Sequence, residues 1–372
     1  MPTTIGQSTF ASGVALYREV AAEESGNLAL SPVSLTGALA PVAAGARGET
    51  RAAIGRAMGF GAGDVLAPTG AMLRSLAEKR AGGRVDIANA LWLAHDLTPN
   101  PEFVAAARSE LDAEVATLDF RQGAAAARRI NAWAKANTEG RVPHVIDPPF
   151  DATRLVITNA VYLLADWADQ FDATATRAAD FFAPGKTVQA PLMHRIGDYR
   201  MVDDGDAQIL DLPYADGRMS LSLVLPRKRD GLAALERRLS GDDLARRLAA
   251  LDSAPLRPVE VRIPKAEFSG SFSLNGPLMA MGMGIAFTDQ ADLSGIANEP
   301  LAISRVLQST FLKLDEKGTE AAAVTAVDIM VTGAMSFEGP QFRADHPFLF
   351  VLRDRPTGAL LFIGRVADPT AR

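Results

Sequence analysis

The chain has 372 residues, of which 48% are hydrophobic and 22% charged, and its formal net charge is −6. These proportions exclude a disordered or fibrous chain, and the acidic balance disfavours a nucleic-acid partner. The absence of cysteine excludes disulfides, thiol catalysis and thiolate metal sites.

Helical patterns crowd the first half of the chain. Phe10, Val14 and Tyr17 recur at helical spacing and predict an opening helix that ends before Gly26. Ser31 is placed as an N-cap, with Pro32 at the first position of a helix that continues to residue 45. Further helices are predicted near 69–81, 101–113, 122–138, 231–250 and 274–282.

Strand patterns dominate the second half. Residues 155–164 are nearly all apolar, which predicts a strand buried on both faces. In 219–225 leucines alternate with serines, which predicts a half-buried strand, and 203–206 reads as a hairpin turn. We expect an α+β fold in one domain spanning 1–372. The other predicted strands are 28–30, 85–93, 115–120, 259–263, 306–314, 348–352 and 360–366.

A search for catalytic chemistry finds no candidate. The chain has no G-x-S-x-G elbow, P-loop or zincin helix. Its four histidines are far apart in the sequence and have no metal-ligand spacing. We therefore expect no enzyme, no cofactor and no metal site. No apolar run reaches the roughly 18 residues that a membrane-spanning helix needs, so no membrane partner is expected.

The segment 316–339 is unusual for a loop. It is rich in small residues and has no proline. Its odd positions from Thr319 to Ile329 carry no charge, whereas the even positions carry Glu320 and Asp328. This period of two, with small residues on one face, is typical of a strand that can slide between two existing strands. An alanine-rich helix or a plain edge strand would also fit the segment taken alone.

The sequence around this segment resembles the serpin family along nearly the whole chain. Residues 27–34, with Asn27, Ser31, Pro32 and Ser34, resemble the family's opening of its second helix. Residues 158–162 followed by Trp167 are similar to its central strand. The runs 315–323, 342–350 and 362–366 match its proximal hinge and closing signatures. The chain is identified as an inhibitory, prokaryotic-like serpin.

The resemblance implies three β-sheets, about nine helices and an exposed reactive-centre loop at 316–340. It implies a suicide-substrate inhibitor of serine-type endopeptidases, whose partner is a target protease held as a covalent acyl complex. The resemblance also implies a monomer outside the cell, with the cytoplasm as the alternative, since residues 1–7 show no signal peptide.

Two groups of residues are carried over from the family. The hinge comprises Glu316, Gly318, Thr319, Glu320, Ala321, Ala322 and Ala323. The sheet-opening region comprises Trp167 and Lys265 at the top of the main sheet, and Ser31, Ser34, Asn159 and Gln308 lower down. Gln308 stands where the family usually has a histidine. Glutamine can still donate and accept hydrogen bonds, but the pH sensitivity of a histidine is lost.

The scissile bond is bracketed by two counts. Counting forward from Glu316 places Thr332 on the acyl side, followed by Gly333. Counting back from Pro347 leads to Ser336, with Met335 between the two. Thr332 suits an elastase- or subtilisin-like pocket and Met335 a chymotrypsin-like pocket. Neither lysine nor arginine lies between residues 318 and 342, which disfavours trypsin-like targets.

An alternative from another class is a non-inhibitory serpin scaffold that acts as a binding protein or chaperone. Such members tend to carry charged, bulky or proline residues in the hinge, and the hinge here does not.

Overall fold

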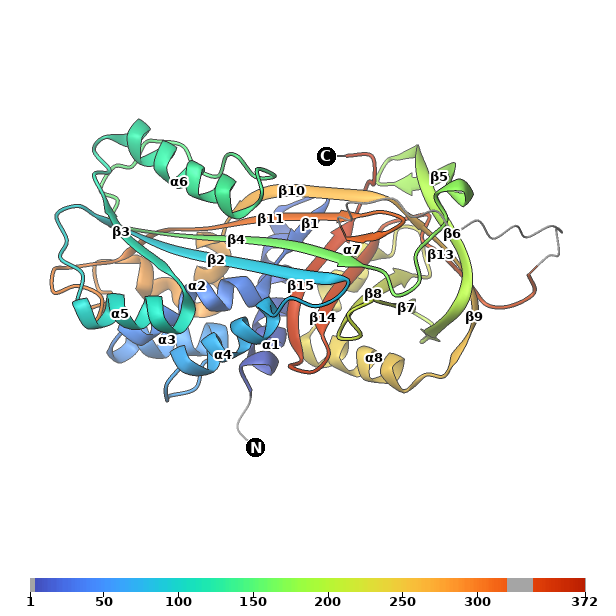
Figure 1. The fold of residues 1–372 in the computed structure, drawn as a ribbon, viewed down its shortest axis with the longest axis horizontal. Coiled ribbons are helices and arrows are strands. Elements are labelled where there is room, and N and C mark those ends of the chain that lie inside the picture. Colours follow the sequence, from blue (N-terminus) through green and yellow to red (C-terminus); the bar gives the residue numbers. More distant parts are fainter. Residues whose placement is uncertain (1–3, 320–336, 372) are drawn as a thin grey trace.

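The computed structural model describes residues 4–319 and 337–371. The molecule is elongated, and a six-stranded sheet runs along its length (Figure 1). Within the described residues no helix has the length and apolarity to cross a membrane.

Helices gather around one end of the six-stranded sheet (Figure 1). Helix α6 packs on β4 and β2 from one side, and α2 and α4 pack on the same sheet from the other. Short 3₁₀ and π turns lie at 173–175 and 279–287. The helices are α1 (Ile5–Glu23), α2 (Pro32–Gly45), α3 (Gly48–Met58), α4 (Leu66–Ala77), α5 (Pro101–Leu111), α6 (Gly123–Asn137), α7 (Leu232–Arg238), α8 (Gly241–Ser253) and α9 (Asn275–Leu278).

The six-stranded sheet has the order β10-β11-β12-β4-β2-β3. Its strands are β2 (Gly83–Ala94), β3 (Glu114–Leu118), β4 (Leu155–Asp166), β10 (Ala266–Ser273), β11 (Ile303–Leu314) and β12 (Gly318–Thr319). As predicted, β4 is buried on both faces along most of its length, because helices cover both sides of the sheet.

The other strands form a second network in the order β1-β15-β14-β8-β7-β6-β9-β13, with β5 paired to β6. The long β6 belongs to two sheets, since its first part pairs with β5 and β9 and its end pairs with β7. The predicted α+β fold is confirmed, and two of its three sheets are joined along β6. These strands are β1 (Leu28–Leu30), β5 (Arg177–Ala183), β6 (Lys186–Asp203), β7 (Ala207–Pro213), β8 (Met219–Pro226), β9 (Leu256–Pro264), β13 (Gln341–Arg343), β14 (Phe348–Asp354) and β15 (Ala359–Val366).

Two element predictions are wrong. The helix expected at 231–250 is two helices, because Leu239 is extended and the Ser240 side chain caps α8 by accepting from the Asp243 N–H. The strand at 219–225 is buried on both faces, since Ser220 and Ser222 are fully buried with hydrogen-bond partners of their own.

Candidate functional site at the hinge of the six-stranded sheet

Strands β4 and β11 are direct neighbours along most of their length. They pair in parallel from Ile303 beside Leu155 to Phe311 beside Tyr162. Beyond that point the two strands part, and the two residues of β12 lie between them. The sheet is therefore closed in its middle and open at one end, which we call the hinge end.

At the hinge end, β12 pairs with both neighbours in antiparallel fashion. Thr319 lies opposite Leu314 of β11 and Ala165 of β4. Gly318 has φ 155° and a Cβ there would stand 2.0 Å from the Ala165 carbonyl oxygen, so only glycine fits. The prediction that 316–340 is exposed is wrong at its start, because Gly318 and Thr319 are buried and already part of the sheet.

The Thr319 side chain is fully buried, as its place on the uncharged face predicts. Its hydroxyl shares a hydrogen bond of 2.7 Å with the hydroxyl of Tyr214. Tyr214 in turn stacks on Trp167 with ring centroids 4.6 Å apart. Burial raises the pKa of Tyr214 well above its usual value, so the hydroxyl stays protonated. The first residue of the hinge pattern is thus held by a direct polar contact.

Trp167 and the residues after it hold the backbone that leads into β12. The indole Nε1 donates to the Asp315 carbonyl at 2.9 Å. The backbone N–H groups of Trp167 and Phe171 donate to the carbonyls of Lys317 and Glu316, both at 2.8 Å.

The Glu316 carboxylate is fixed from two sides. Lys265 Nζ donates to it at 2.8 Å and Thr176 Oγ1 at 2.9 Å. Burial works to raise the pKa of Glu316, but the hydrogen bonds from Lys265 and Thr176 outweigh it, and the pKa lies below its ordinary value. The structure therefore brings Glu316, Lys265 and Trp167 together at the hinge end, and the carboxylate is ionised at neutral pH.

A buried polar cluster lies lower in the sheet, where β4 and β11 touch. Gln308 Oε1 accepts from the Ser31 N–H at 2.8 Å, and Gln308 Nε2 donates to the Ser31 carbonyl at 2.8 Å. The same Nε2 donates to Asn159 Oδ1 at 2.9 Å. Gln308 uses both ends of its amide, so it links β11 to β4 and to the start of α2.

Asn159 extends this cluster to the next strand. Its Nδ2 donates to Ser34 Oγ and, at 2.7 Å, to Asn89 Oδ1 of β2. Ser31 occupies the N-cap of α2, but its side chain makes no capping hydrogen bond, and its buried Oγ has no partner within the described residues. The polar cluster consists of Ser31, Ser34, Asn89, Asn159 and Gln308.

Sequence reasoning missed Asn89, Thr176 and Tyr214. Asn89 had a visible signal, an amide within an otherwise apolar strand. Thr176 and Tyr214 had none, because they lie 140 and 105 residues from their hinge partners. The predictions for Glu320, Ala321, Ala322, Ala323, Thr332, Gly333, Met335 and Ser336 fall outside the described residues.

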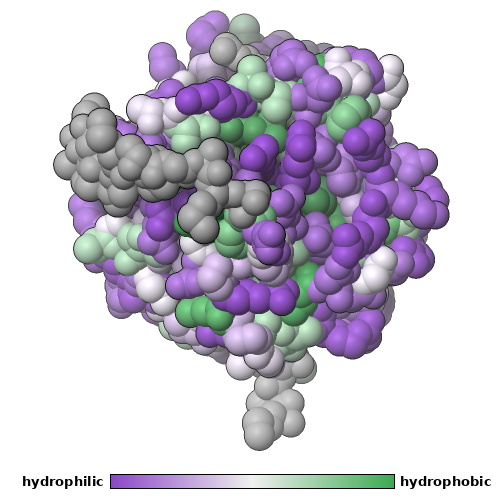
Figure 2. Space-filling view, turned by 90° about the vertical axis from the view of Figure 1, so that its right-hand side faces the viewer, coloured by the Kyte–Doolittle hydropathy of each residue, from purple (hydrophilic) through white to green (hydrophobic). Residues whose placement is uncertain are grey.

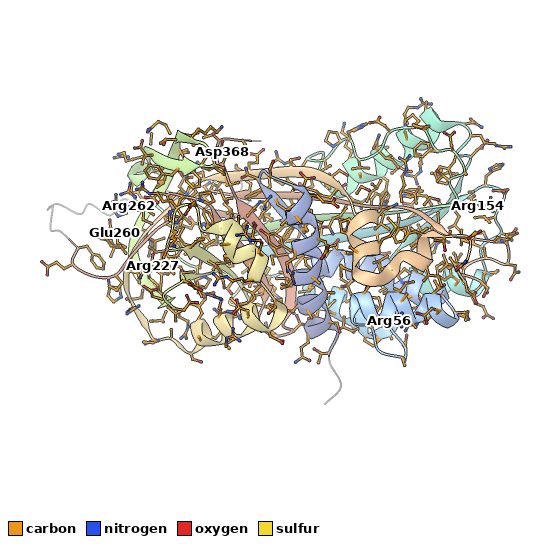
Figure 3. All side chains as sticks on the ribbon, turned by 180° about the vertical axis from the view of Figure 1, so that it is seen from behind. Arg56, Arg154, Arg227, Glu260, Arg262 and Asp368 are labelled. Carbon is orange, nitrogen blue, oxygen red and sulfur yellow. The ribbon has the colours of Figure 1, made fainter. Side chains whose placement is uncertain are left out.

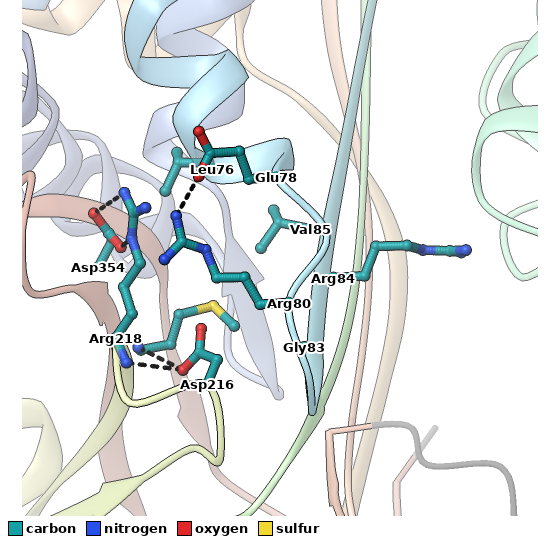
Figure 4. A pocket seen from close by; sticks show the side chains of 10 residues that line it. Leu76, Glu78, Arg80, Gly83, Arg84, Val85, Asp216, Arg218 and Asp354 are labelled. Atoms are coloured by element: carbon teal, nitrogen blue, oxygen red, sulfur yellow. Dashed lines mark hydrogen bonds and ion pairs between the residues drawn. The ribbon is translucent and has the colours of Figure 1, made fainter.

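The described part of the structure has two hollows near the sheet. In Figure 4, Arg218 points at Asp354 and Arg80 at Glu78, and these pairs leave a space of only about 10 Å³. That volume is too small for any ligand. A larger, polar hollow of about 460 Å³ lies between β2, the end of α5 and α6. Asn89 of the polar cluster is among the residues that line it.

Comparison with known proteins agrees with this geometry. The family model described as serpin (serine protease inhibitor) matches residues 7–369. A serpin-like protein of Thermococcus kodakarensis is 37% identical over 360 residues, covering 95% of this chain and 83% of the relative. The leukocyte elastase inhibitor of Bos taurus is 32% identical, covering 93% of this chain and 94% of the relative.

Solved structures show the same architecture. Human thyroxine-binding globulin in complex with thyroxine has a TM-score of 0.90 at 27% identity, with 99% of each chain covered. Serpin48 of the insect Tenebrio molitor has a TM-score of 0.87 at 30% identity, with 98% of each chain covered. Members of this family are mostly protease inhibitors rather than catalysts. The chain belongs to the serpin family.

Proposed function

We propose that the chain is an inhibitory serpin that traps serine-type endopeptidases of small or apolar specificity by inserting its cleaved loop between β4 and β11. The observation that carries the proposal is the position of Thr319, already paired between those two strands. An inserting strand needs an entry point with small, uncharged residues, and the hinge end supplies one.

The chemical step belongs to the protease. Its serine oxygen attacks the carbonyl carbon of the scissile residue, the peptide C–N bond breaks, and the protease histidine delivers the proton to the leaving amine. The product is an ester between protease and inhibitor. An ordinary substrate is then released by water, whereas here insertion of the freed strand displaces the protease before water can act.

The register of β12 predicts which loop residue an inserted strand would bring to the polar cluster. Thr319 pairs with Leu314 of β11 and Ala165 of β4. Gln308 lies six residues before Leu314, and Asn159 lies six residues before Ala165. These two residues pair with each other in the present structure. In the inserted form the same register would bring residue 325, a threonine, between them. A small hydroxyl there would replace the direct Gln308–Asn159 contact with two new hydrogen bonds, at little steric cost.

The test is incubation with elastase, subtilisin and chymotrypsin. We expect a complex that survives SDS and a released peptide of about 40 residues, the length that follows a cut near Thr332. Mass spectrometry of that peptide decides between cleavage at Thr332–Gly333 and cleavage at Met335 or Ser336. Loop cleavage without trapping by all three enzymes would contradict the proposal.

The alternative is a non-inhibitory scaffold that binds a ligand. Thyroxine-binding globulin shares the fold, and the polar hollow of about 460 Å³ could hold a small molecule. Thermal melting before and after loop cleavage separates the two functions. A loop that inserts raises the melting midpoint, whereas a scaffold with an inert loop keeps the midpoint unchanged.

A further inference from the structure

His346 is a buried histidine, 7% exposed, whose two ring nitrogens both have partners. Its Nδ1 lies 2.8 Å from the Asp345 carboxylate, and its Nε2 lies 2.7 Å from the Pro226 carbonyl oxygen at the end of β8. A carbonyl oxygen has no proton to give, so Nε2 must donate to Pro226. The charge of the ring therefore depends on whether Asp345 or His346 holds the proton between them.

The Asp345 carboxyl is ionised in this arrangement. Burial works to raise the pKa of Asp345, but the contact with His346 and two arginine charges outweigh it, and the pKa lies below its ordinary value. The arginines are Arg343, whose Nε is 3.1 Å from the carboxylate, and Arg229. An ionised carboxylate can only accept hydrogen bonds, so Nδ1 must donate as well. His346 thus donates from both nitrogens and is an imidazolium.

Charged groups from several segments surround this pair. The Asp345 carboxylate favours a charged ring, whereas the charges of Arg343 and Arg229 oppose it. Arg229 follows β8 and lies over the Phe182 ring of β5, 3.5 Å from the ring centre. Further charged groups on the segments that contact 340–346 are paired among themselves, namely Arg227 with Asp203, and Glu260 with Arg262 and His194. Because one carboxylate holds the proton against two arginines, a change of pH can remove it.

His346 ends a segment that anchors the far side of the reactive-centre loop. The Pro340 carbonyl and the Ala344 N–H bond to β9, each at 2.9 Å, and β13 pairs with β9 between them. The Asp345 carbonyl accepts from β5 at 2.8 Å, and the His346 ring adds the bond to β8. Residues 340–346 are thus held by three strands in succession, and the last of these contacts depends on the histidine.

The anchor lies at one end of the molecule. Figure 3 labels Arg227, directly after β8, at the same end as Glu260 and Arg262 of β9. Figure 2 looks onto that end, where hydrophilic residues cover much of the surface. His346 lies beneath this surface, so water does not readily replace a hydrogen bond that the ring loses.

We propose that His346 is a positioning residue that, as an imidazolium, clasps the far end of the reactive-centre loop to β8, and that this clasp weakens as the pH rises. Histidine side chains change their charge between about pH 5 and 8. A neutral ring keeps one N–H, so one of its two partners would then face a lone pair. The stabilisation is therefore present at low pH and is lost as the proton leaves.

The link from this clasp to inhibition rests on the proposed function. In that function, a protease must bind the loop before it can be trapped, and the residues after the scissile bond must stay in place while it does so. The clasp between His346, Asp345 and Pro226 holds those residues.

The test is hydrogen exchange of the backbone N–H groups that hold the anchor, those of Phe182, Glu260 and Ala344, at about pH 6 and about pH 8.5. The rates are corrected for the intrinsic effect of pH on exchange. We expect the protection of these groups in the parent protein to be roughly fivefold lower at the higher pH, which corresponds to the loss of about one hydrogen bond.

Two variants of the clasp should respond in opposite ways. His346→Gln carries no charge at either pH, so protection should be low at both. The amide of Asp345→Asn can donate to Nδ1 of a neutral ring, which leaves the ring's own N–H for Pro226, so protection should stay high at both. A merely structural role would lower protection in both variants. The matched control is His194→Gln, which changes a histidine beside Glu260 on the neighbouring strands and should keep the parent's pH response.

Any of four results would overturn the inference. These are equal protection of the parent at the two pH values, a pH response that survives His346→Gln, a pH response that disappears in His194→Gln, and equal losses in Asp345→Asn and His346→Gln. Trapping by the parent protein is measured in parallel. If exchange follows the prediction but no protease is trapped, the proposed function fails while the clasp stands.

Discussion

The hinge end and the middle of β4 and β11 differ in what lies between the two strands. At the hinge end, Gly318 and Thr319 already lie between them. In the middle, Gln308 and Asn159 are joined directly by a hydrogen bond of 2.9 Å. Six residues along β4 separate the two points, or about 20 Å of strand. Under the proposed mechanism, Gly318 and Thr319 are the start of the inserting strand, and the polar cluster is the next contact that insertion must open.

The largest effect is expected from Thr319→Arg. The site is fully buried between two strands, and an unpaired charge there costs several kcal/mol. The hinge should leave the sheet while the rest of the fold remains, and the protease should cut the loop and escape. We expect the number of inhibitor molecules consumed per trapped protease to rise by about tenfold or more.

The control for Thr319→Arg is Thr319→Ser, which keeps a small hydroxyl and should trap normally. Circular dichroism verifies that the arginine variant is folded. Undiminished trapping by that folded variant would show that residue 319 does not lie on the insertion path.

Gln308→Leu probes the other region. It removes three hydrogen bonds and takes the partner in the core from the Ser31 N–H and from Asn159 Oδ1, whereas the Ser31 carbonyl still accepts from the Leu35 N–H. We expect a loss of about 2–4 kcal/mol in the free energy of unfolding, measured by urea denaturation. Ser309→Ala, at the next residue on the opposite face of β11, is the control and should cost less than about 1 kcal/mol. If the two variants lose the same free energy of unfolding, the hydrogen bonds of Gln308 do not stabilise the sheet more than an ordinary buried contact does.

Tyr214→Phe weakens the hinge end more gently. It deletes the hydroxyl that bonds Thr319 and keeps the ring stacked on Trp167. We expect a loss of about 1 kcal/mol, together with a change in Trp167 fluorescence as Thr319 loosens. Tyr162→Phe on β4 is the control. A fluorescence and stability profile identical to the parent would mean that the hydroxyl pair does not hold the hinge.

The smallest effect concerns pH. Because the folded-state pKa of Glu316 is lowered, its ion pair with Lys265 stabilises the fold above the ordinary value of 4.5. That contribution is lost as pH falls through the lowered pKa. Glu316→Gln should cost about 0.5–1 kcal/mol at neutral pH, since Lys265 is partly exposed. The variant should lose less stability than the parent between neutral and acidic pH, and parallel pH profiles would contradict the assignment.

Much of the difference between the hinge end and the polar cluster could be predicted from the sequence. The family resemblance grouped Gln308 with Asn159, and it paired Glu316 with Lys265. The early pairing of Gly318 and Thr319 could not be predicted, because it depends on β4 and β11 parting at that point. Tyr214 follows β7, far from Thr319 in the sequence, so no local sequence pattern predicts their contact.

Strands β5, β6, β7, β10 and β13 were not predicted, and two of them, β6 and β10, show why. Strand β10 alternates in Ala266–Ser273, but small residues and a central glycine give it few large apolar side chains, and β6 contains proline and glycine that interrupt its alternation. Both are held by the ladders that they form with β11 and β9. Local propensity is weak in such strands, and tertiary pairing decides their conformation.

The absence of cysteine allows one direct measurement of whether β4 and β11 must separate. Ala160 and Ser309 are small, buried and directly paired across the two strands. Replacing both with cysteine should permit a disulfide that holds the sheet closed, since paired strand positions have suitable spacing. We predict that the oxidised protein is cleaved without trapping the protease and gains no thermal stability on cleavage, and that reduction of the same sample restores both. Trapping by the oxidised protein at the parent level would contradict insertion between these strands.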